Sequence, residues 1–203
     1  MSTKIYIWSD NHFFHDNIIK YCNRPFEYSK NGSLECLKYQ IENYLKTVKE
    51  NDLCIFLGDL VYLNKCNVEK FEEMFNKLPG HKILVLGNHD DCNYDFKRLG
   101  FEFVLDYFII DKTMFCHYPL TDDSEFLKAF KDNNCNLLYH GHVHNKEVQN
   151  TDFKRINCCV DYGNNNYTPI EISDSTLKSQ ILEKFCYLWE IALKINNLVR
   201  IIL

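Results

Sequence analysis

Five short apolar segments of this chain each end in a cluster of Asp, Asn or His, and this pattern constrains the fold most strongly. Residues 5–8, 53–57, 83–86 and 137–139 are continuous apolar runs bounded by polar residues. Such runs are typical of strands buried on both faces of a sheet. A fifth strand is indicated at residues 113–116. The edge where these strands end is therefore expected to carry the chemistry.

Amphipathic helices and further strands are predicted between these runs. The first helix is expected to begin at Ser33, because a serine oxygen can accept a hydrogen bond from the first helical turn. Its apolar residues, among them Leu37 and Ile41, lie on one stripe. The alternation of strands and helices predicts an α/β protein. Helices are predicted at residues 33–50, 68–78 and 124–132, and the additional strands at residues 101–110 and 155–160.

Polar residues directly follow each of the five strands. Ser, Asp and Asn are common in turns and caps, so one such cluster would indicate only a capped turn. Five clusters instead indicate a ligand crevice, because ligands bind at the carboxyl ends of strands in open α/β sheets. Glycines at three junctions would allow a close approach of the backbone to a ligand. The clusters are Ser9-Asp10-Asn11-His12, Gly58-Asp59, Gly87-Asn88-His89-Asp90, His117 and His140-Gly141-His142-Val143-His144.

The donor atoms of these clusters suit a pair of metal ions. One bridging carboxylate would give each of two ions four bonds. Carboxylate, amide and imidazole ligands together favour Mn, Fe, Zn, Ni or Co over Mg or Ca. Two such ions about 3.5 to 4 Å apart can generate hydroxide at neutral pH and bind both oxygens of an in-line displacement at phosphorus. The candidate ligands are Asp10, His12, Asp59, Asn88, His117, His142 and His144.

The order of these motifs resembles that of the calcineurin-like metallophosphoesterases. "DNH", "GD", "GNHD", the His of "CHYP" and "GHVH" follow one another between residues 10 and 144. The opening is similar to a compact, single-domain bacterial and phage-type branch, in which "SD-x-HF-x-H" leads to "RPF". His15 and Arg24 stand in those places, and the stretch "INCCVDYGNNNYTPIEI" is similar to the closing strand and turn of that branch.

The resemblance implies a fold and a ligand arrangement. The fold would be two mixed β-sheets forming a central sandwich flanked by helices, in four layers. Asp59 would bridge two divalent transition-metal ions, with manganese the favoured metal. The first ion would be bound by Asp10, His12 and His144, and the second by Asn88, His117 and His142.

The resemblance also implies roles for residues that do not bind metal. His89 would face the substrate as an acid or as a positively charged stabiliser of the leaving oxygen. Asp90 would take part in catalysis or, as a turn residue, only orient the loop. His15 would contact the substrate or a carboxylate, or be a solvated loop residue. Arg24 would hold a phosphate oxygen with two hydrogen bonds, or be an ordinary loop arginine.

The expected reaction is hydrolysis of a phosphoester bond by a metal-bridging hydroxide. Only 28 residues separate Asn88 from His117, which leaves no room for a cap domain and predicts an open site. Aromatic residues in the loops, such as Tyr21 and Tyr62, would stack a nucleobase or pack the loops. A phosphodiesterase acting on a small nucleotide-like substrate is marginally favoured. The alternatives are a phosphomonoesterase and a non-enzymatic metal-binding scaffold of the same fold.

Net charge and hydropathy argue against several classes of partner. The net charge of −5 argues against long nucleic acids and anionic membranes, which attract basic surfaces. No apolar run approaches the roughly 20 residues of a membrane helix, and no signal peptide is expected. The ten cysteines are scattered without a C-x-x-C motif, so we expect reduced thiols in a cytoplasmic protein.

The sequence divides into residues 1–173, the metallophosphoesterase domain, and residues 174–203, a C-terminal amphipathic helix. Apolar residues recur in this tail at spacings of four and three, which is the pattern of a helix that packs along one partner stripe. The partner would be the chain's own domain or a second copy in a homodimer. The stripe consists of Ile181, Phe185, Leu188, Ala192, Ile195, Val199 and Ile202.

Overall fold

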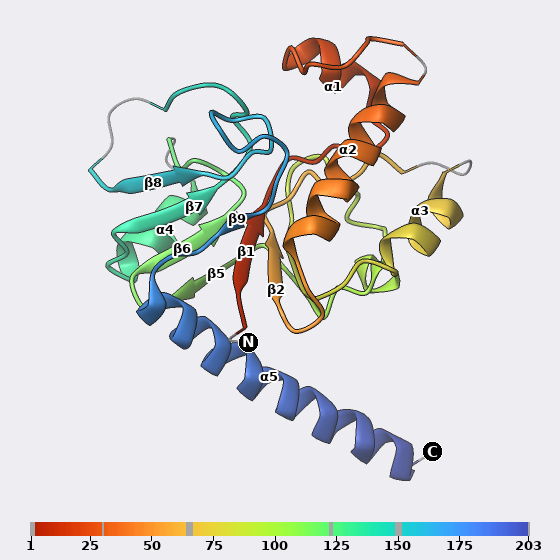
Figure 1. Cartoon of the computed structure of the whole chain (residues 1–203). Helices are drawn as coiled ribbons and strands as arrows, with labels where there is room; N and C mark the ends of the chain where they lie inside the picture. Colours follow the sequence, from red (N-terminus) through yellow and green to blue (C-terminus); the bar gives the residue numbers. More distant parts are fainter. Residues whose placement is uncertain (1–2, 30, 64–66, 122–123, 149–151, 203) are drawn as a thin grey trace. The chain divides into compact units, whose positions relative to one another are not determined.

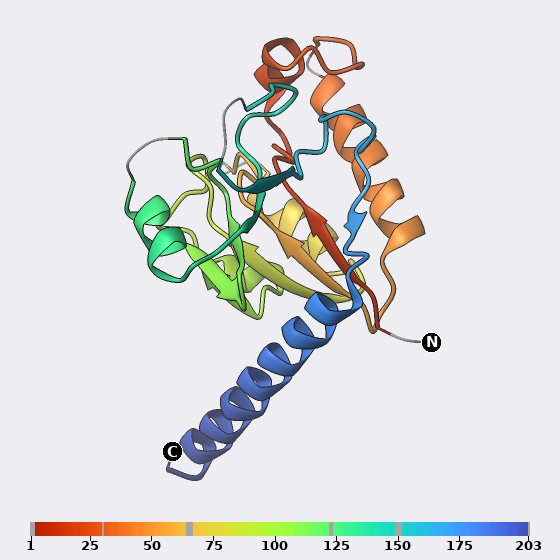
Figure 2. The same cartoon turned by 90° about the vertical axis from the view of Figure 1, so that its left-hand side faces the viewer.

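The chain forms two compact units, Met1–Glu171 and Ile172–Leu203. Its structure is a computed structural model that describes residues 3–29, 31–63, 67–121, 124–148 and 152–202, with side chains described as far as residue 190. The first unit contains all strands and four α-helices of the described residues, and the second contains one long helix (Figures 1 and 2).

A five-stranded sheet forms the centre of the first unit, in the order β4-β3-β2-β1-β9. Neighbouring strands from β1 to β4 are parallel, with Ile5 opposite Leu53 and Ile83 opposite Phe103, whereas β9 is antiparallel to β1. The strands are β1 (Ile5–Trp8), β2 (Leu53–Phe56), β3 (His81–Val85), β4 (Phe103–Leu105) and β9 (Ile170–Glu171).

A second sheet of four strands has the order β5-β6-β7-β8. β6, β7 and β8 are parallel, and β5 is antiparallel to β6. The two mixed sheets with flanking helices confirm the predicted α/β fold. The strands are β5 (Tyr107–Ile110), β6 (Thr113–Cys116), β7 (Leu137–His140) and β8 (Lys154–Asn157).

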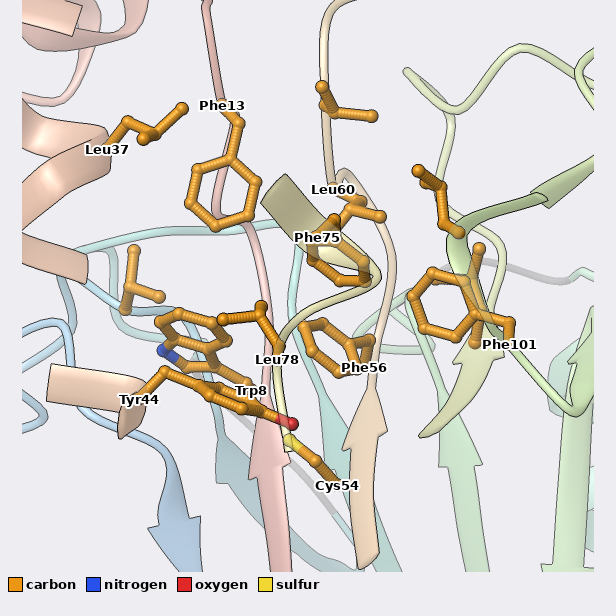
Figure 3. Packing of buried hydrophobic residues seen from close by; sticks show 14 of the residues in the cluster. Trp8, Phe13, Leu37, Tyr44, Cys54, Phe56, Leu60, Phe75, Leu78 and Phe101 are labelled. Atoms are coloured by element: carbon orange, nitrogen blue, oxygen red, sulfur yellow. The ribbon is translucent and has the colours of Figure 1, made fainter. Parts of the chain in front are cut away.

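Helices α2 (Gly32–Thr47) and α3 (Val68–Phe75) cover one face of the first sheet. Tyr44 of α2 lies 5.3 Å from Trp8 of β1, and Phe75 of α3 lies 5.6 Å from Phe56 of β2, both measured between ring centroids (Figure 3). All residues of β1 are buried, so the opposite face is covered as well. Figure 1 shows the second sheet on that side.

Helix α4 (Glu125–Asp132) covers a face of the second sheet. Its residue Phe130 packs in one buried cluster with Met114 of β6 and Leu138 of β7. The helices therefore lie outside the two sheets, and each sheet has a face buried by helices.

The structure corrects several predicted boundaries. The apolar stretch 101–110 is not one strand: it forms β4 and β5 in different sheets, with Asp106 between them. An apolar run does not reveal where the chain leaves one sheet for another. Ser33 is not the N-cap of α2, because that position is taken by Asn31 and the Ser33 hydroxyl bonds to the Asp16 carboxylate.

Some elements are shorter than predicted, and two were not predicted. The strand predicted at residues 155–160 ends at Asn157, after which Cys159 forms only an isolated bridge with Ser9. Helix α3 ends at Phe75 instead of residue 78. The short helices α1 (Asp16–Tyr21) and η1 (Phe96–Leu99) were missed, because a single turn or two carries too little periodic pattern.

The second unit consists mainly of α5 (Ser175–Ile202). Its 28 residues give a length of about 42 Å at 1.5 Å per residue. Ala192, Ile195, Val199 and Ile202 of the predicted apolar stripe have side chains outside the described residues. Among the described residues, none of the helices combines the length and the hydropathy needed to cross a bilayer.

Backbone hydrogen bonds join the carboxyl ends of both sheets at one place. Asp10 N–H donates to the Gly58 carbonyl, and Gly141 N–H donates to the His117 carbonyl, each at 3.0 Å. Val160 N–H donates to the Ser9 carbonyl, also at 3.0 Å, and so links the two sheets. The polar clusters that follow the strands therefore meet at a single edge.

Candidate metal centre

Five of the seven predicted ligands have backbone conformations that L-residues rarely adopt. Their φ angles are positive: 58° for Asp10, 50° for His12, 52° for Asp59, 73° for His142 and 53° for His144. Such conformations are unfavourable for residues other than glycine and persist only where the surroundings impose them. The turns that carry the candidate ligands therefore store strain.

Two glycines let neighbouring turns approach each other. A Cβ atom at Gly87 would overlap the carboxylate of Asp59, and one at Gly141 would overlap the side chains of Ser9 and Asp10. The glycines thus make room for the carboxylates of the adjacent turn, whereas we predicted that they make room for a ligand.

One group of candidate ligands consists of Asp10, His12 and His144. One donor atom from each lies within 4.8 Å of the others. Nε2 of His144 lies 3.7 Å from Oδ1 of Asp10, and Nε2 of His12 lies 3.5 Å from Oδ2 of Asp59. The Nε2 atom of His12 is buried and has no hydrogen-bond partner among the described residues. A buried imidazole nitrogen next to carboxylates fits a metal ligand.

A second group consists of Asp59, Asn88, His117 and His142. Oδ1 of Asn88 lies 2.8 Å from Nδ1 of His142 and 3.1 Å from Nε2 of His117. Nε2 of His117 lies 3.5 Å from Oδ2 of Asp59. The same Asp59 oxygen is thus 3.5 Å from a histidine of each group, which is the position expected of a bridging carboxylate.

Outer contacts orient the histidines. Nδ1 of His117 lies 2.7 Å from the Leu57 carbonyl oxygen. A carbonyl only accepts, so this nitrogen carries the proton and Nε2 presents a lone pair to the cluster. Nδ1 of His144 lies 3.1 Å from each carboxylate oxygen of Asp161. Both contacts are of the kind that fixes the tautomer of metal-binding histidines.

The protonation states agree with a cation site. Burial lowers the pKa of His12 well below its usual value, so its imidazole is neutral. Burial also acts to lower the pKa of His144, but its hydrogen bonds to Asp161 and Cys22 and the charge of Asp10 raise that pKa to about 10. Asp10 and Asp161 thus stabilise positive charge at His144, which a divalent ion would supply in place of the proton.

His89 and Asp90 occupy different environments. The backbone N–H of His89 donates to Oδ1 of Asp59 at 2.8 Å, and its exposed ring lies 5.4 Å from the ring of His12. The Asp90 carboxylate accepts three backbone N–H groups, from Asp59, Leu60 and Gly87, at 2.8 to 2.9 Å. Burial raises the pKa of Asp90 to about 6. Asp90 therefore orients two turns, whereas His89 is free to meet a substrate.

Arg24 forms hydrogen bonds through its guanidinium with oxygen atoms of the protein. Its buried guanidinium donates to the Asp161 carboxylate at 2.9 Å and to the carbonyl oxygens of Asp10 and Asn11 at 2.7 and 3.0 Å. We expected these hydrogen bonds to go to a phosphate. The sequence did not distinguish the two cases, because an arginine that binds substrate and one that is buried among protein oxygens look alike in it. Arg24 therefore positions the turn at residues 10–12.

His15 lies beside the centre. Its Nδ1 is 3.2 Å from Nδ1 of His12, and its ring stacks on that of Tyr62 at 5.6 Å between centroids. It lines a hollow of about 380 Å³ over the centre. The hollow is lined by His12, His15, Ile18, Tyr21, Cys22, Asp59, His89, His142, Val143, His144, Asn145 and Lys146. His15 is thus placed to orient His12 and to meet a substrate.

Sequence reasoning missed two thiols at the centre. Sγ of Cys159 lies 3.2 Å from Oδ2 of Asp10, and Cys22 lies within 4.8 Å of donor atoms of His144 and Asp161. Their only sequence signal was proximity to a predicted strand or loop. The nine described cysteines are free thiols.

A cavity of about 570 Å³ lies elsewhere. It is at the amino ends of β1 and β2, beside Lys4 and Asp52. Its described lining contains no histidine or cysteine. This cavity therefore lies at the opposite ends of β1 and β2 from the candidate ligands that follow those strands.

Comparison with known proteins agrees with this geometry. Residues 3–122 match the calcineurin-like phosphoesterase family. The chain is 35% identical over 177 residues to the uncharacterized protein MJ1445 of Methanocaldococcus jannaschii, covering 83% of this chain and 87% of that protein. The crystal structure of AQ665 from Aquifex aeolicus, a protein of unknown function, superposes with a TM-score of 0.63 at 30% identity, covering 84% of this chain and 96% of the other.

Proposed function

Because the chain belongs to the calcineurin-like phosphoesterase family, we propose that it is a metal-dependent phosphodiesterase acting on a small nucleotide-like substrate. The observation that carries the proposal is the Asp59 carboxylate, whose Oδ2 lies 3.5 Å from His12 on one side and from His117 on the other. A shared carboxylate between two histidine groups is the arrangement that a pair of divalent ions requires.

Two divalent transition-metal ions would complete the centre, with manganese the favoured metal. One would be held by Asp10, His12 and His144, the other by Asn88, His117 and His142, with Asp59 between them. When bound, such ions activate water and neutralise the charge that develops on a phosphoryl group. Neutral imidazoles and carboxylates suit Mn, Fe, Zn, Ni or Co.

The protein's own residues orient the reacting groups. His89 donates a proton to the leaving oxygen from its exposed position beside His12. The bond from its backbone N–H to Asp59 fixes its distance from the centre. The Asp90 carboxylate orients the turn that carries Asp59 and the turn that carries His89 by accepting three backbone hydrogen bonds. We propose the cytoplasm as the location, since free thiols suit a reducing compartment.

Hydrolysis of two chromogenic substrates separates this proposal from its alternatives. The purified protein would be stripped of metal, reloaded with each ion in turn, and assayed on bis-p-nitrophenyl phosphate and p-nitrophenyl phosphate. We expect two bound ions per chain and faster hydrolysis of the diester. Preference for the monoester would indicate a phosphomonoesterase. Two bound ions without hydrolysis of either compound would indicate a metal-binding scaffold.

A second proposal concerns the C-terminal helix. We propose that residues 174–203 cover an apolar surface of the chain's own domain, and the alternative is a homodimer contact. Phe185 and Trp189, whose ring centroids lie 6.4 Å apart along this helix, belong to its apolar stripe or flank it.

A further inference from the structure

Two hollows of the first unit meet at the candidate metal centre. The first, of about 380 Å³, contains His15, Tyr21 and His89. The second, of about 290 Å³, lies beside the loop that follows β6. His142 lines both. Among the described residues, the second hollow is lined by Tyr118, Pro119, Leu120, Thr121, Ser124, Phe126 and His142.

A phosphodiester carries two organic substituents, one that leaves and one that remains on phosphorus, whereas a monoester carries only the one that leaves. We propose that the hollow at Tyr118 and Phe126 binds the substituent that remains on phosphorus, an aromatic or nucleoside group, and that the hollow at His89 binds the leaving alcohol. This inference rests on the proposed function and assigns a binding site to each of the two substituents of the substrate.

The position of His89 decides which hollow receives which group. In hydrolysis, the oxygen of water bonds to phosphorus, the bond from phosphorus to the leaving oxygen breaks, and that oxygen takes up a proton. The acid must therefore lie on the side of the leaving group. His89 lines the first hollow and is not among the described lining residues of the second. The remaining substituent then points to the second hollow, across His142.

The chemistry of the second hollow suits a ring. Tyr118 stacks on Phe126 with centroids 5.4 Å apart and planes at 22°, and its ring lies 5.4 Å from that of His142. The described lining contains no Asp, Glu, Lys or Arg. The Ser124 hydroxyl accepts the N–H of Leu127. Aromatic rings arranged in this way favour a flat ring as the bound group.

The size of the second hollow limits the substituent. Its volume of about 290 Å³ is near the lower end of the volumes of small-molecule pockets, about 300 to 1,000 Å³. It can hold one ring system or nucleoside and cannot enclose a polymer. A small diester with an aromatic group on the retained side is therefore the expected substrate.

Kinetics on a matched pair of diesters test the assignment. Methyl p-nitrophenyl phosphate and phenyl p-nitrophenyl phosphate release the same p-nitrophenol and leave methyl or phenyl phosphate. We expect the metal-loaded wild type to show a kcat/KM about tenfold higher for the phenyl diester, because the ring is buried. Phe126→Ala should lower this ratio at least threefold. If Phe126→Ala does not fold, Thr121→Trp replaces it as the test. Thr121 is an exposed lining residue, and a tryptophan there should lower the ratio by filling the hollow.

Tyr21→Ala is the matched control, since Tyr21 is an exposed aromatic residue of the first hollow. It should change both rates together and leave the ratio as in the wild type. A binding measurement without turnover complements the kinetics: calorimetry should show phenylphosphonate binding about tenfold more tightly than methylphosphonate, and Phe126→Ala should remove this difference.

The outcomes separate the inference from the proposed function. If the ratio falls in Tyr21→Ala but not in the Phe126 or Thr121 variants, the two hollows are assigned in reverse and the inference is wrong. A ratio near one in the wild type also overturns it while leaving the phosphodiesterase intact. Hydrolysis of neither diester by protein with two bound ions overturns the proposed function, and the inference with it.

Discussion

Arg24 and Asp161, which are 137 residues apart, form a buried ion pair with Nε of Arg24 2.9 Å from Oδ2 of Asp161. Burial raises the pKa of Asp161, but the bond from His144 and the charge of Arg24 outweigh it and hold that pKa below its usual value. The pair thus joins the turn at residues 10–12, whose carbonyl oxygens bind Arg24, to His144, which bonds to Asp161. All three candidate ligands of one ion, Asp10, His12 and His144, are therefore linked through this pair.

Arg24→Lys should weaken metal binding without removing a ligand. Lysine cannot reproduce the three directed hydrogen bonds of the guanidinium, so we expect a 10- to 100-fold lower metal affinity and a loss of about 1 to 3 kcal/mol in unfolding free energy. Chelator competition and urea unfolding measure both. Arg98→Lys is the matched control, since Arg98 makes an exposed pair with Glu72 and should change stability by less than about 0.5 kcal/mol. If Arg24→Lys instead raised KM and left metal affinity unchanged, the result would support the hypothesis that Arg24 contacts the substrate phosphate.

Asp59→Asn should impair hydrolysis more than substitution of any single histidine ligand. An amide is a poor bridge between two cations, so occupancy of both ions should fall. Metal analysis and kcat measure the effect. Asp91→Asn serves as control, because Asp91 is an exposed carboxylate directly after Asp90 that accepts the backbone N–H of Asn93 and is not among the candidate ligands. Near-wild-type turnover of Asp59→Asn with two ions bound would rule out the bridging role.

His89→Ala should lower kcat by roughly 100-fold or more and leave metal content unchanged. The loss should be smaller for a p-nitrophenyl ester than for an alkyl ester, because p-nitrophenolate leaves without a proton. Rates on both kinds of diester give the comparison. Equal losses for the two leaving groups would argue against an acid role for His89.

Glycine and alanine at position 142 should differ in stability. Both remove the imidazole, but glycine adopts the φ of 73° without the cost of about 1 to 2 kcal/mol that an L-residue bears. Metal-free His142→Gly should therefore be more stable than His142→Ala by about 1 kcal/mol in urea unfolding. At His89, which is not among the residues of positive φ, glycine should be the less stable of the two. If the glycine and alanine variants ranked in the same order of stability at both positions, the result would contradict backbone strain at His142.

Removal of residues 174–203 tests the role of the C-terminal helix. If the helix covers its own domain, the shortened chain should aggregate or unfold, and the full chain should scatter light as a particle of about 24.2 kDa. A full chain of twice that mass, together with a soluble truncated monomer that still binds metal, would instead establish a dimer contact.

The sequence predicts the elements that end at the centre better than the elements that frame it. Asp10, Asp59 and Asn88 follow buried strands, and adjacent parallel strands bring their ends together, so periodicity and order suffice. The sheet switch at Asp106 has no such signal, because β4 and β5 are equally apolar. The environment of Arg24 also has no sequence signal: whether its guanidinium faces a phosphate or protein oxygens depends on tertiary contacts such as that with Asp161, 137 residues away.

The union of both sheets at one edge has a consequence for how the protein folds. The N–H of His142 donates to the carboxylate of Asp10 across 132 residues, and the candidate ligands come from turns of both sheets. A complete donor set thus exists only after both sheets have formed and docked, so the ions would bind late. Because they bind the native state alone, each tenfold excess over the dissociation constant would add about 1.4 kcal/mol to its stability. Metal supply would then determine what fraction of the chains is folded, as well as how fast the folded ones work.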